Sequence, residues 1–522
     1  MGTDDLEYNL IATGSNNGTY SVNIGSVSGG KVNIPAMHRP AFDVDVHVNN
    51  ETWYSTYRAV TEIAANAFAS SAITELDILP RTTTPKGTDI QLKAIGANAF
   101  QNCAQLVELT IPNVDIDSTA FTGSALRKVT IYKRDIPGSL FQNTATLQEV
   151  ILMEGVTTIG ALAFRNCTAL AQLTIPSTVA SIAVNAFEGC TGLRILTSYI
   201  NIDTIFTSTH ISFNNLRELH LLGTRVTGIL NTHPFNNLTF LETVVLSPSV
   251  QNIGINAFNG CTSLATVTMP GVVNIRDSAF RGCTSLTTVT LPTSLRTIEQ
   301  YAFENCTSLT AASLPNGVTT IGRNAFSGCG ALADIAQTNN NVIPSTVTSI
   351  GIFAYAGTAI TAVTLPNNQS FTVINDNTFN GCEDLTTVIF PAASRITRIG
   401  DNAFEGCESL GNLAIPLSVA TIGIEAFKGC TGLGTVAVVD GSSSLRTISA
   451  RAFDGCNGTG TTVIVPTTVT AVGVSAFNLF KGNLIILGKG TEATADRIWG
   501  WNEDTSVGWR AGIDAAANVQ YL

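Results

Sequence analysis

Three sets of side chains in this chain have types and spacings that could support chemistry. The first is Asp43, Asp45 and His47, which alternate along the segment FDVDVHV and would share one face of a strand. Carboxylate and imidazole groups at positions i, i+2 and i+4 could hold a metal ion. The same alternation also describes the solvated face of a terminal strand, and we favour this simpler interpretation.

The second set is a group of three histidines, His210, His220 and His233, in a stretch that also contains Arg217 and Arg225. A catalytic histidine needs a nucleophile and an orienting group in contact with it. No Ser or Cys nucleophile accompanies these histidines in the repeat frame described below. The sequence therefore predicts no enzyme and no cofactor, and the stretch is interpreted as a variable segment or a local contact patch.

The third set is the eleven cysteines, each of which lies three residues after a recurring aromatic residue, as Cys283 follows Phe280. One Cys in the same slot of each repeat is typical of a small buried hydrophobe. Disulfides between successive repeats would need a matching Cα separation and torsion at every step, and the number is odd. We predict buried free thiols, with a disulfide or metal role as the alternative. The cysteines are Cys103, Cys167, Cys190, Cys261, Cys283, Cys306, Cys329, Cys382, Cys407, Cys430 and Cys456.

The element that must position all these residues is a repeat of about 23 residues. A fixed period in this range, with one strand and one compact turn per coil, is the signature of a leucine-rich-repeat solenoid. The recurring aromatic residue marks the repeats. It is found at Phe68, Phe100, Phe121, Phe141, Phe164, Phe187, Phe213, Phe235, Phe258, Phe280, Phe303, Phe326, Tyr355, Phe379, Phe404, Phe427, Phe453 and Phe477.

Within each repeat, the apolar pattern L-x-x-V-x-L-P, as in Leu286–Pro292, predicts a short strand with one buried face. The proline lacks an N–H group and ends the strand at the same place in each coil. A second apolar group, V-x-x-I-G-x-x-A-F, must also point inward. The predicted fold class is a leucine-rich-repeat solenoid of the α/β repeat class, mostly β and irregular. We expect a right-handed coil of about 18 repeats, with one short parallel strand per coil.

The predicted domain organisation is a single solenoid between two caps. Residues 1–58 lack the repeat and contain strand-like segments at Tyr20–Ile24 and Lys31–Ile34, so we expect an N-terminal β cap. Residues 59–488 form the solenoid, which is irregular near 196–240. Residues 489–522 leave the pattern and form the expected C-terminal cap, which contains Trp499, Trp501 and Trp509.

Composition excludes several classes of function. Only 12% of the residues are charged and the net charge is −11, so no nucleic-acid-binding patch is indicated. No apolar run approaches the length of a membrane span. The first residues, MGTDDLEYN, do not resemble a signal peptide. Either the protein is cytoplasmic or this is a mature region to which an initiator Met was added, and the family resemblance described next favours the mature region.

The repeat motif resembles that of the BspA-type leucine-rich-repeat proteins. The resemblance is carried by IGRNAFSGC at Ile321–Cys329 and LTTVTLP at Leu286–Pro292, and it covers about residues 59–488. It implies a secreted or cell-surface protein of host-associated bacteria or parasitic protists. The family is linked to adhesion to host cells and matrix proteins and to coaggregation. It supplies no catalytic residues to transfer, and the oligomeric state stays open.

From this we expect a non-enzymatic adhesin for a host matrix or cell-surface protein. Two basic stretches are the candidate partner-binding site, which comprises Arg127, Lys128, Lys133, Arg134, Arg217, His220 and Arg225. The alternative is a glycan-binding or structural module of a larger surface protein, with a polysaccharide as partner. Outward threonines such as Thr266, Thr268, Thr288 and Thr290 could serve it, although strand propensity alone also explains them.

Overall fold

The computed structural model describes most of the repeat region and parts of both ends of the chain. The described residues are 19–22, 30–34, 37–38, 58–78, 82–83, 89–90, 93–200, 214–223, 235–336, 341–438, 443–458, 460–488, 491–499, 508–515 and 517–522. They belong to two compact units, Met1–Val226 (unit 1) and Thr227–Leu522 (unit 2). The boundary between the units falls within the predicted irregular stretch.

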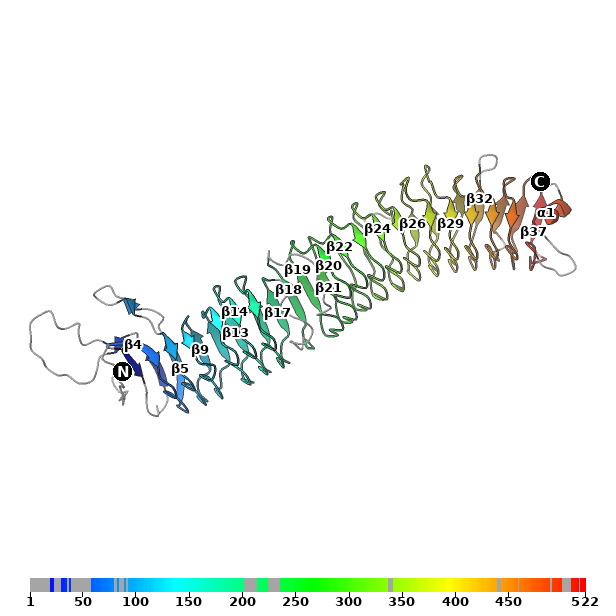
Figure 1. Cartoon of the computed structure of the whole chain (residues 1–522). Helices are drawn as coiled ribbons and strands as arrows, with labels where there is room; N and C mark the ends of the chain where they lie inside the picture. Colours follow the sequence, from blue (N-terminus) through cyan, green and yellow to red (C-terminus); the bar gives the residue numbers. More distant parts are fainter. Residues whose placement is uncertain are drawn as a thin grey trace, which may run out of the picture. The chain divides into compact units, whose positions relative to one another are not determined.

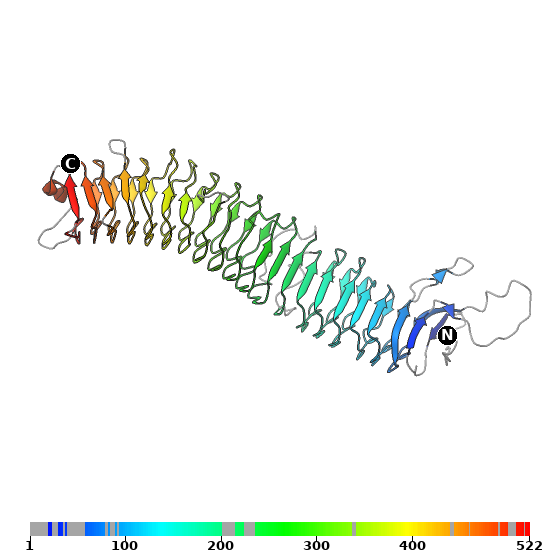
Figure 2. The same cartoon turned by 180° about the vertical axis from the view of Figure 1, so that it is seen from behind.

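In unit 1, the longer strands of successive coils pair in parallel, like the rungs of a ladder (Figures 1 and 2). A second ladder is formed by strands that, after β1 and β4, have only two residues each. The longer strands are β2 (Gly30–Ile34), β5 (Ile73–Ile78), β9 (Glu108–Ile111), β11 (Lys128–Ile131), β13 (Glu149–Leu152), β15 (Gln172–Ile175), β17 (Ile195–Ser198) and β18 (Glu218–Leu221). The second ladder contains β1 (Thr19–Val22), β4 (Arg58–Ile63), β8 (Ala94–Ile95) and β10 (Asp115–Ile116), then β12 (Asp135–Ile136), β14 (Thr158–Ile159) and β16 (Ser181–Ile182).

Two antiparallel pairs lie outside these ladders in unit 1. Strand β3 (Met37–His38) pairs with β4. Strands β6 (Thr82–Thr83) and β7 (Asp89–Ile90) pair with each other and enclose an insertion between two coils. Strands β1 and β2 pair in parallel with β4 and β5, so the N-terminal strands continue the pattern of the repeats.

Unit 2 repeats the arrangement, but its longer-strand ladder is in three parts. These are β19 (Thr243–Leu246) with β21 (Thr266–Thr268), then β26 (Ala362–Thr364) with β28 (Thr387–Ile389), then β30 (Leu413–Ile415), β32 (Thr435–Val438), β34 (Thr462–Val465), β36 (Asn483–Ile486) and β37 (Asn518–Tyr521). The second ladder has two parts. They are β20 (Asn252–Ile253), β22 (Asn274–Ile275), β23 (Thr297–Ile298), β24 (Thr320–Ile321) and β25 (Ser349–Ile350), then β27 (Val373–Ile374), β29 (Arg398–Ile399), β31 (Thr421–Ile422), β33 (Thr447–Ile448) and β35 (Ala471–Val472).

The parallel ladders confirm the predicted leucine-rich-repeat solenoid and add a second strand to the one expected per coil. In β11, Val129 and Ile131 are buried while Lys128 and Thr130 are half-buried, as the alternation predicted. The second strand is the residue pair at the Ile of V-x-x-I-G. Two residues are too few to show a strand period in a sequence, and only pairing between coils reveals them.

A column of stacked aromatic rings forms the centre of each unit. Consecutive ring centroids lie between 5.1 and 5.9 Å apart, from Phe68 to Phe187 in unit 1 and from Phe235 to Phe477 in unit 2. The rings are nearly parallel, with an angle of 19° at most, between Phe141 and Phe164. Phe213 lies outside the described residues. Each ring is sealed between its neighbours, so one coil alone could not bury it.

The compact turns that carry the aromatic rings mostly contain two residues with positive φ, although the turn of Phe121 has only Gly123. Around Phe326 these are Asn324 (φ 53°) and Gly328 (φ 72°). Asn and Gly tolerate this conformation best, which explains the pattern N-A-F-x-G-C. At Gly189, a side chain would also collide with Oδ1 of Asn166 in the preceding coil.

The last described residues cover the end of unit 2. Strand β37 pairs in parallel with β36, and the helix α1 (Glu492–Trp499) lies near β35. The rings of Trp499 and Trp509 meet edge to face at 5.2 Å, and Trp509 Nε1 donates a hydrogen bond to Asp496 Oδ1 (3.1 Å). Trp501 lies outside the described residues. Within the part of the chain that the structure describes, no helix has the length and apolarity needed to cross a bilayer.

Candidate interaction surface

The predicted basic residues of unit 1 lie on and beside the outward face of its longer strands. Arg127 precedes β11 and Arg217 precedes β18, and both are exposed. Backbone hydrogen bonds place them in one column across five coils, with the order Arg127, Gln148, Ala171, Arg194 and Arg217. At about 4.8 Å per coil, the first and last members are roughly 19 Å apart. The two basic stretches therefore share one face without touching.

Two of the predicted residues lie beside a carboxylate on this face, and the contact of Lys128 is an ion pair. Lys128 Nζ lies 3.2 Å from Glu149 Oε2 in the adjacent coil. His220 Nε2 lies 3.5 Å from Glu218 Oε2 on the same strand. Both contacts are partly exposed, so each contributes little to the stability of the fold. The side chains can therefore leave these contacts and pair with charged groups on a binding partner.

Lys133 and Arg134 follow β11 and lie beyond the end of that strand. Lys133 is only 8% exposed, and its Nζ lies 3.7 Å from Asp115 Oδ1. Arg134 is exposed, and its backbone N–H donates to Asn113 Oδ1 (3.1 Å). Lys133 is thus available to a partner only if it leaves its buried position. The other candidates from the sequence, Arg225, Asp43, Asp45, His47, His210 and His233, lie outside the described residues.

Sequence reasoning missed four residues that the structure adds to this face. Arg194 is exposed in the coil next to Arg217. At the opposite end of the strands, Tyr132 (47% exposed), Tyr199 and Leu222 occupy equivalent positions of their coils. The signal was available, because each of the three follows directly after a predicted strand, where most coils carry Pro or a small residue. Arginine and tyrosine are the residue types most enriched at the centres of protein interfaces.

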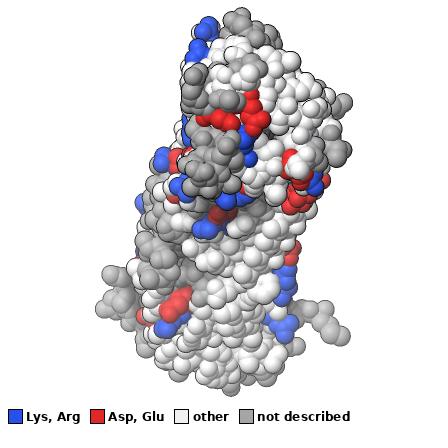
Figure 3. Space-filling model, turned by 90° about the vertical axis from the view of Figure 1, so that its right-hand side faces the viewer, with Lys and Arg blue, Asp and Glu red and all other residues white. Residues whose placement is uncertain are grey.

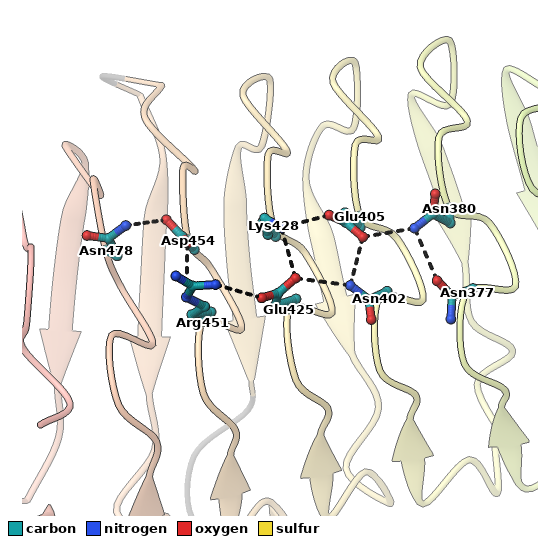
Figure 4. Close-up of polar contacts among 9 residues, drawn as sticks. All are labelled: Asn377, Asn380, Asn402, Glu405, Glu425, Lys428, Arg451, Asp454 and Asn478. Atoms are coloured by element: carbon teal, nitrogen blue, oxygen red, sulfur yellow. Dashed lines mark hydrogen bonds and ion pairs between the residues drawn. The ribbon is translucent and has the colours of Figure 1, made fainter.

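In unit 2, charged and amide side chains gather instead along the compact turns, in a row of nine residues (Figure 4). Glu425 lies at its centre, 2.9 Å from Lys428 Nζ and 3.1 Å from Arg451 Nη1. Lys428 also lies 2.9 Å from Glu405, and Asn402 Nδ2 donates to Glu405 Oε2 (2.7 Å). The row is internally paired across successive coils, so its role is to hold the turns together. Its members are Asn377, Asn380, Asn402, Glu405, Glu425, Lys428, Arg451, Asp454 and Asn478.

This pairing recurs along unit 2, as between Arg281 and Glu304 and between Arg398 and Asp376. Figure 3 shows positive and negative side chains next to each other in small clusters, with uncharged surface between them. Paired charges of both signs create no extended field of one sign. The surface in this view is therefore not built to attract a polyanion.

All eleven cysteines are free thiols and are buried. Burial raises the pKa of Cys190 to about 12 and that of Cys382 to about 11, because a thiolate would lose its hydration. A thiol becomes a nucleophile or metal ligand only as the thiolate. Among the described residues, no group of three or more His, Cys, Asp and Glu could hold a metal ion.

The repeat itself decides the family. The family model described as BspA type leucine rich repeat region (6 copies) matches residues 47–134, 134–232, 228–347 and 348–484. The chain belongs to this family. A comparison with curated proteins gave no match.

Several solved structures resemble this BspA-type chain. A leucine-rich repeat protein from Bacteroides ovatus is 18% identical, with 100% of this chain and 99% of that chain covered and a TM-score of 0.39. A leucine rich cell surface protein from Faecalibacterium prausnitzii is 20% identical, with 93% and 94% covered and a TM-score of 0.24. The leucine rich repeat protein of T. pallidum is 28% identical over 37% of this chain and 72% of that chain, with a TM-score of 0.26.

Proposed function

We propose that the protein is a non-enzymatic, secreted or cell-surface protein that binds a protein partner through the outward strand face of unit 1. The partner class is a host matrix or cell-surface protein. The observation that supports this most directly is the combination of exposed arginines and exposed aromatic residues on a rigid sheet. Family membership adds a repeat that serves binding in many proteins.

The geometry of the face suits a protein rather than a small molecule. Arg194 and Arg217 at one end of the strands and Tyr199 and Leu222 at the other frame a central strip of half-buried residues, including Thr197 and His220. The charged edge can steer an approaching partner toward the face, and the apolar edge can lose its contact with water when the partner docks. The burial of all eleven thiols supports the non-enzymatic assignment, because a buried thiol does not meet a substrate.

Binding of the folded protein to a panel of matrix proteins, including fibronectin and fibrinogen, tests the proposal at two salt concentrations. Saturable binding that weakens with salt is expected, because arginines contribute to the face. Arg194→Glu with Arg217→Glu should weaken it at least about tenfold, as should Tyr132→Ser with Tyr199→Ser.

Arg323→Glu, at an exposed arginine on the turns of unit 2, is the matched control and should leave the affinity unchanged. Equal effects of the control and the double variant would reject this face as the binding site. Absence of saturable binding to every protein on the panel would count against the partner class.

A further inference from the structure

The longer-strand ladder of unit 2 has an open edge at β37. The last strands of this ladder follow one another in the order β30, β32, β34, β36 and β37, so β37 is the outermost of them (Figure 1). Within the part of the chain that the structure describes, β36 is the only strand that pairs with β37. The edge of a sheet presents a row of N–H and C=O groups that can pair with another chain.

The backbone bonds of β37 show which of its residues face the open edge. The N–H groups of Asn518 and Leu522 donate to carbonyl oxygens in the coil of β36, at 3.1 and 2.8 Å. In a parallel pair, alternate residues direct both backbone groups to the same neighbour, so Gln520 also faces β36. Val519 and Tyr521 therefore direct their N–H and C=O groups to the open edge, where no described backbone group bonds them.

The open edge is regular and lacks the features by which proteins usually prevent edge pairing. β37 keeps an unbroken register with β36, and Asn518 Nδ2 also donates to Asn483 Oδ1 (3.1 Å). The residues of β37 include no charged side chain and no proline. Strand β2, at the edge of the longer-strand ladder in unit 1, contains Lys31, and its register with β5 shifts between Gly30 and Lys31. A lysine and a bulge are two of the features that protect edges.

The inward side chains of β37 keep part of their apolar surface exposed. Leu484 and Ile486 of β36 are fully buried, and their partners in the register are Val519 and Tyr521. Val519 and Tyr521 are only half-buried. A strand added at the open edge would cover them further, and burial of apolar surface would favour its binding.

We propose that the open edge of β37 pairs with the same edge of a second copy of this chain. An antiparallel pair centred on Gln520 places Val519 of each copy opposite Tyr521 of the other. Each of these two residue pairs exchanges two N–H···O bonds, so the four bonds satisfy all the open backbone groups of both strands. In a register centred on Val519 or on Tyr521, only one residue of each β37 strand would find such a partner.

The side chains of β37 also complement those of a second copy. On the inward face, the register brings Val519 beside Tyr521, and β-branched and aromatic residues pair favourably across strands. On the outward face, the exposed Gln520 meets Gln520 of the second copy, and each amide can both donate and accept a hydrogen bond. Neither contact brings like charges together. The edge therefore matches its own sequence in both backbone and side chains, which makes a second copy its occupant.

Sedimentation velocity of the full chain over a wide range of protein concentrations tests the proposal. A pair of four-residue strands is a small interface, so we expect a reversible dimer whose fraction rises with concentration. Gln520→Lys and, separately, Gln520→Glu should each weaken dimerisation roughly tenfold or more, because two like charges then face each other across the strands. An equimolar mixture of the two variants should regain the dimer, since opposite charges then meet.

Two further variants separate the edge from the rest of the sheet. Val519→Pro removes an open N–H group but no bond to β36, and proline is tolerated at a free strand edge, so it should weaken the dimer while the chain stays folded. Thr435→Lys is the matched control for Gln520→Lys. It adds the same charge at an exposed position of β32, inside the ladder, and should leave dimerisation unchanged. Unchanged thermal unfolding of each variant keeps loss of the dimer separate from loss of fold.

Self-association through β37 is independent of the proposed function, because it involves no residue of the unit 1 face. Arg194→Glu with Arg217→Glu should dimerise like the wild type, so the failure of one proposal is distinguishable from that of the other. A chain that stays monomeric at the highest concentration it reaches in solution would overturn the proposal. So would a dimer that survives both Gln520 variants, a mixture of these variants that fails to regain it, or growth into larger assemblies, because two paired β37 edges leave none open for a third copy.

Discussion

The thiol of Cys306 donates a hydrogen bond to the carbonyl oxygen of Phe280, the aromatic residue of the preceding coil, over 3.1 Å. Ten other cysteines make the same contact one coil apart, as Cys190 does with Phe164 and Cys456 with Phe427. In these coils the position holds a side chain that is small, tolerates burial and has a donor hydrogen. Thr144 and Thr358 occupy it in coils without a cysteine and share these properties, whereas Leu238 and Phe480 fill it in two other coils without donating a hydrogen bond.

The buried thiols are expected to be unreactive until the coils open. In native protein at neutral pH, a thiol reagent such as DTNB should label none of the eleven cysteines rapidly, because burial excludes the reagent and, as at Cys261, raises the pKa of the thiol. In denaturant all eleven should react at once. Rapid native labelling of one or two cysteines would show instead that a particular coil opens locally, and mass spectrometry would identify it.

Tyr355 replaces phenylalanine in the stacked column and introduces a hydroxyl that gains nothing there. Its ring is fully buried, and its Oη has no hydrogen-bond partner among the described residues. Tyr355→Phe should raise the free energy of unfolding by about 1 to 3 kcal/mol, the usual cost of an unsatisfied buried polar group. Denaturant titration measures this change.

The reverse substitution in the adjacent coil, Phe326→Tyr, is the control for Tyr355→Phe. It should lower the free energy of unfolding by a similar amount, because it buries a hydroxyl in the same column. A Tyr355→Phe variant less stable than the wild type would mean that the hydroxyl is satisfied in solution.

The sequence predicted the solenoid because the repeat fixes what must be buried. Apolar residues recur from coil to coil at the positions of Leu286, Val289 and Leu291. Because a coil has only one interior, these side chains must all point into it. It could not predict where the longer-strand ladder loosens. The segment T-V-T forms strand β21 at 266–268, yet the same three residues at 288–290 form only an isolated bridge. That difference arises from how successive coils pack, which the local sequence does not encode.

The interaction surface was only partly predictable for a related reason. The position of Arg194 is free of packing constraints, so its residue type follows no repeat and did not stand out. Tyr199 replaces the Pro or small residue that most coils carry after the strand, and this departure could have been noticed. Lys133 was selected for its charge, but its place after β11 buries most of its side chain and leaves its Nζ 3.7 Å from Asp115 Oδ1. A charged residue can be assigned to a binding surface only when its position in the repeat shows that its side chain points outward.

A single turn residue offers a test of the backbone requirement. Leu162 adopts φ 61°, a conformation that costs about 1 kcal/mol for a residue with an ordinary side chain. Leu162→Asn should therefore raise the free energy of unfolding by about 1 kcal/mol. The next coil has Asn185 in the same slot with φ 61°, and Asn185→Leu should destabilise by about as much. Equal destabilisation by both substitutions would indicate that the Leu162 side chain contributes more by packing than it costs in strain.

The row of paired charges in unit 2 predicts how stability changes with pH. Hydrogen bonds from Lys428, and then from Arg451 and Asn402, lower the pKa of Glu425. The folded protein therefore holds Glu425 ionised at a pH where the unfolded chain would protonate it, and this contribution is complete above about pH 4.5. As the pH falls through the lowered pKa, the folded state loses it.

Thermal unfolding measured across this acidic range should consequently show a smaller loss of stability for Glu425→Gln than for the wild type. The variant should be less stable than the wild type at neutral pH, where the ionised carboxylate pairs with Lys428 and Arg451. Glu408→Gln, at an exposed position outside the row, serves as the control and should follow the wild-type pH profile. Because the row is partly exposed, high salt should shrink the difference between Glu425→Gln and the wild type. If the stability of Glu425→Gln depended on pH as strongly as that of the wild type, other carboxylates would cause the acid sensitivity. The row would then have no measurable electrostatic contribution to stability.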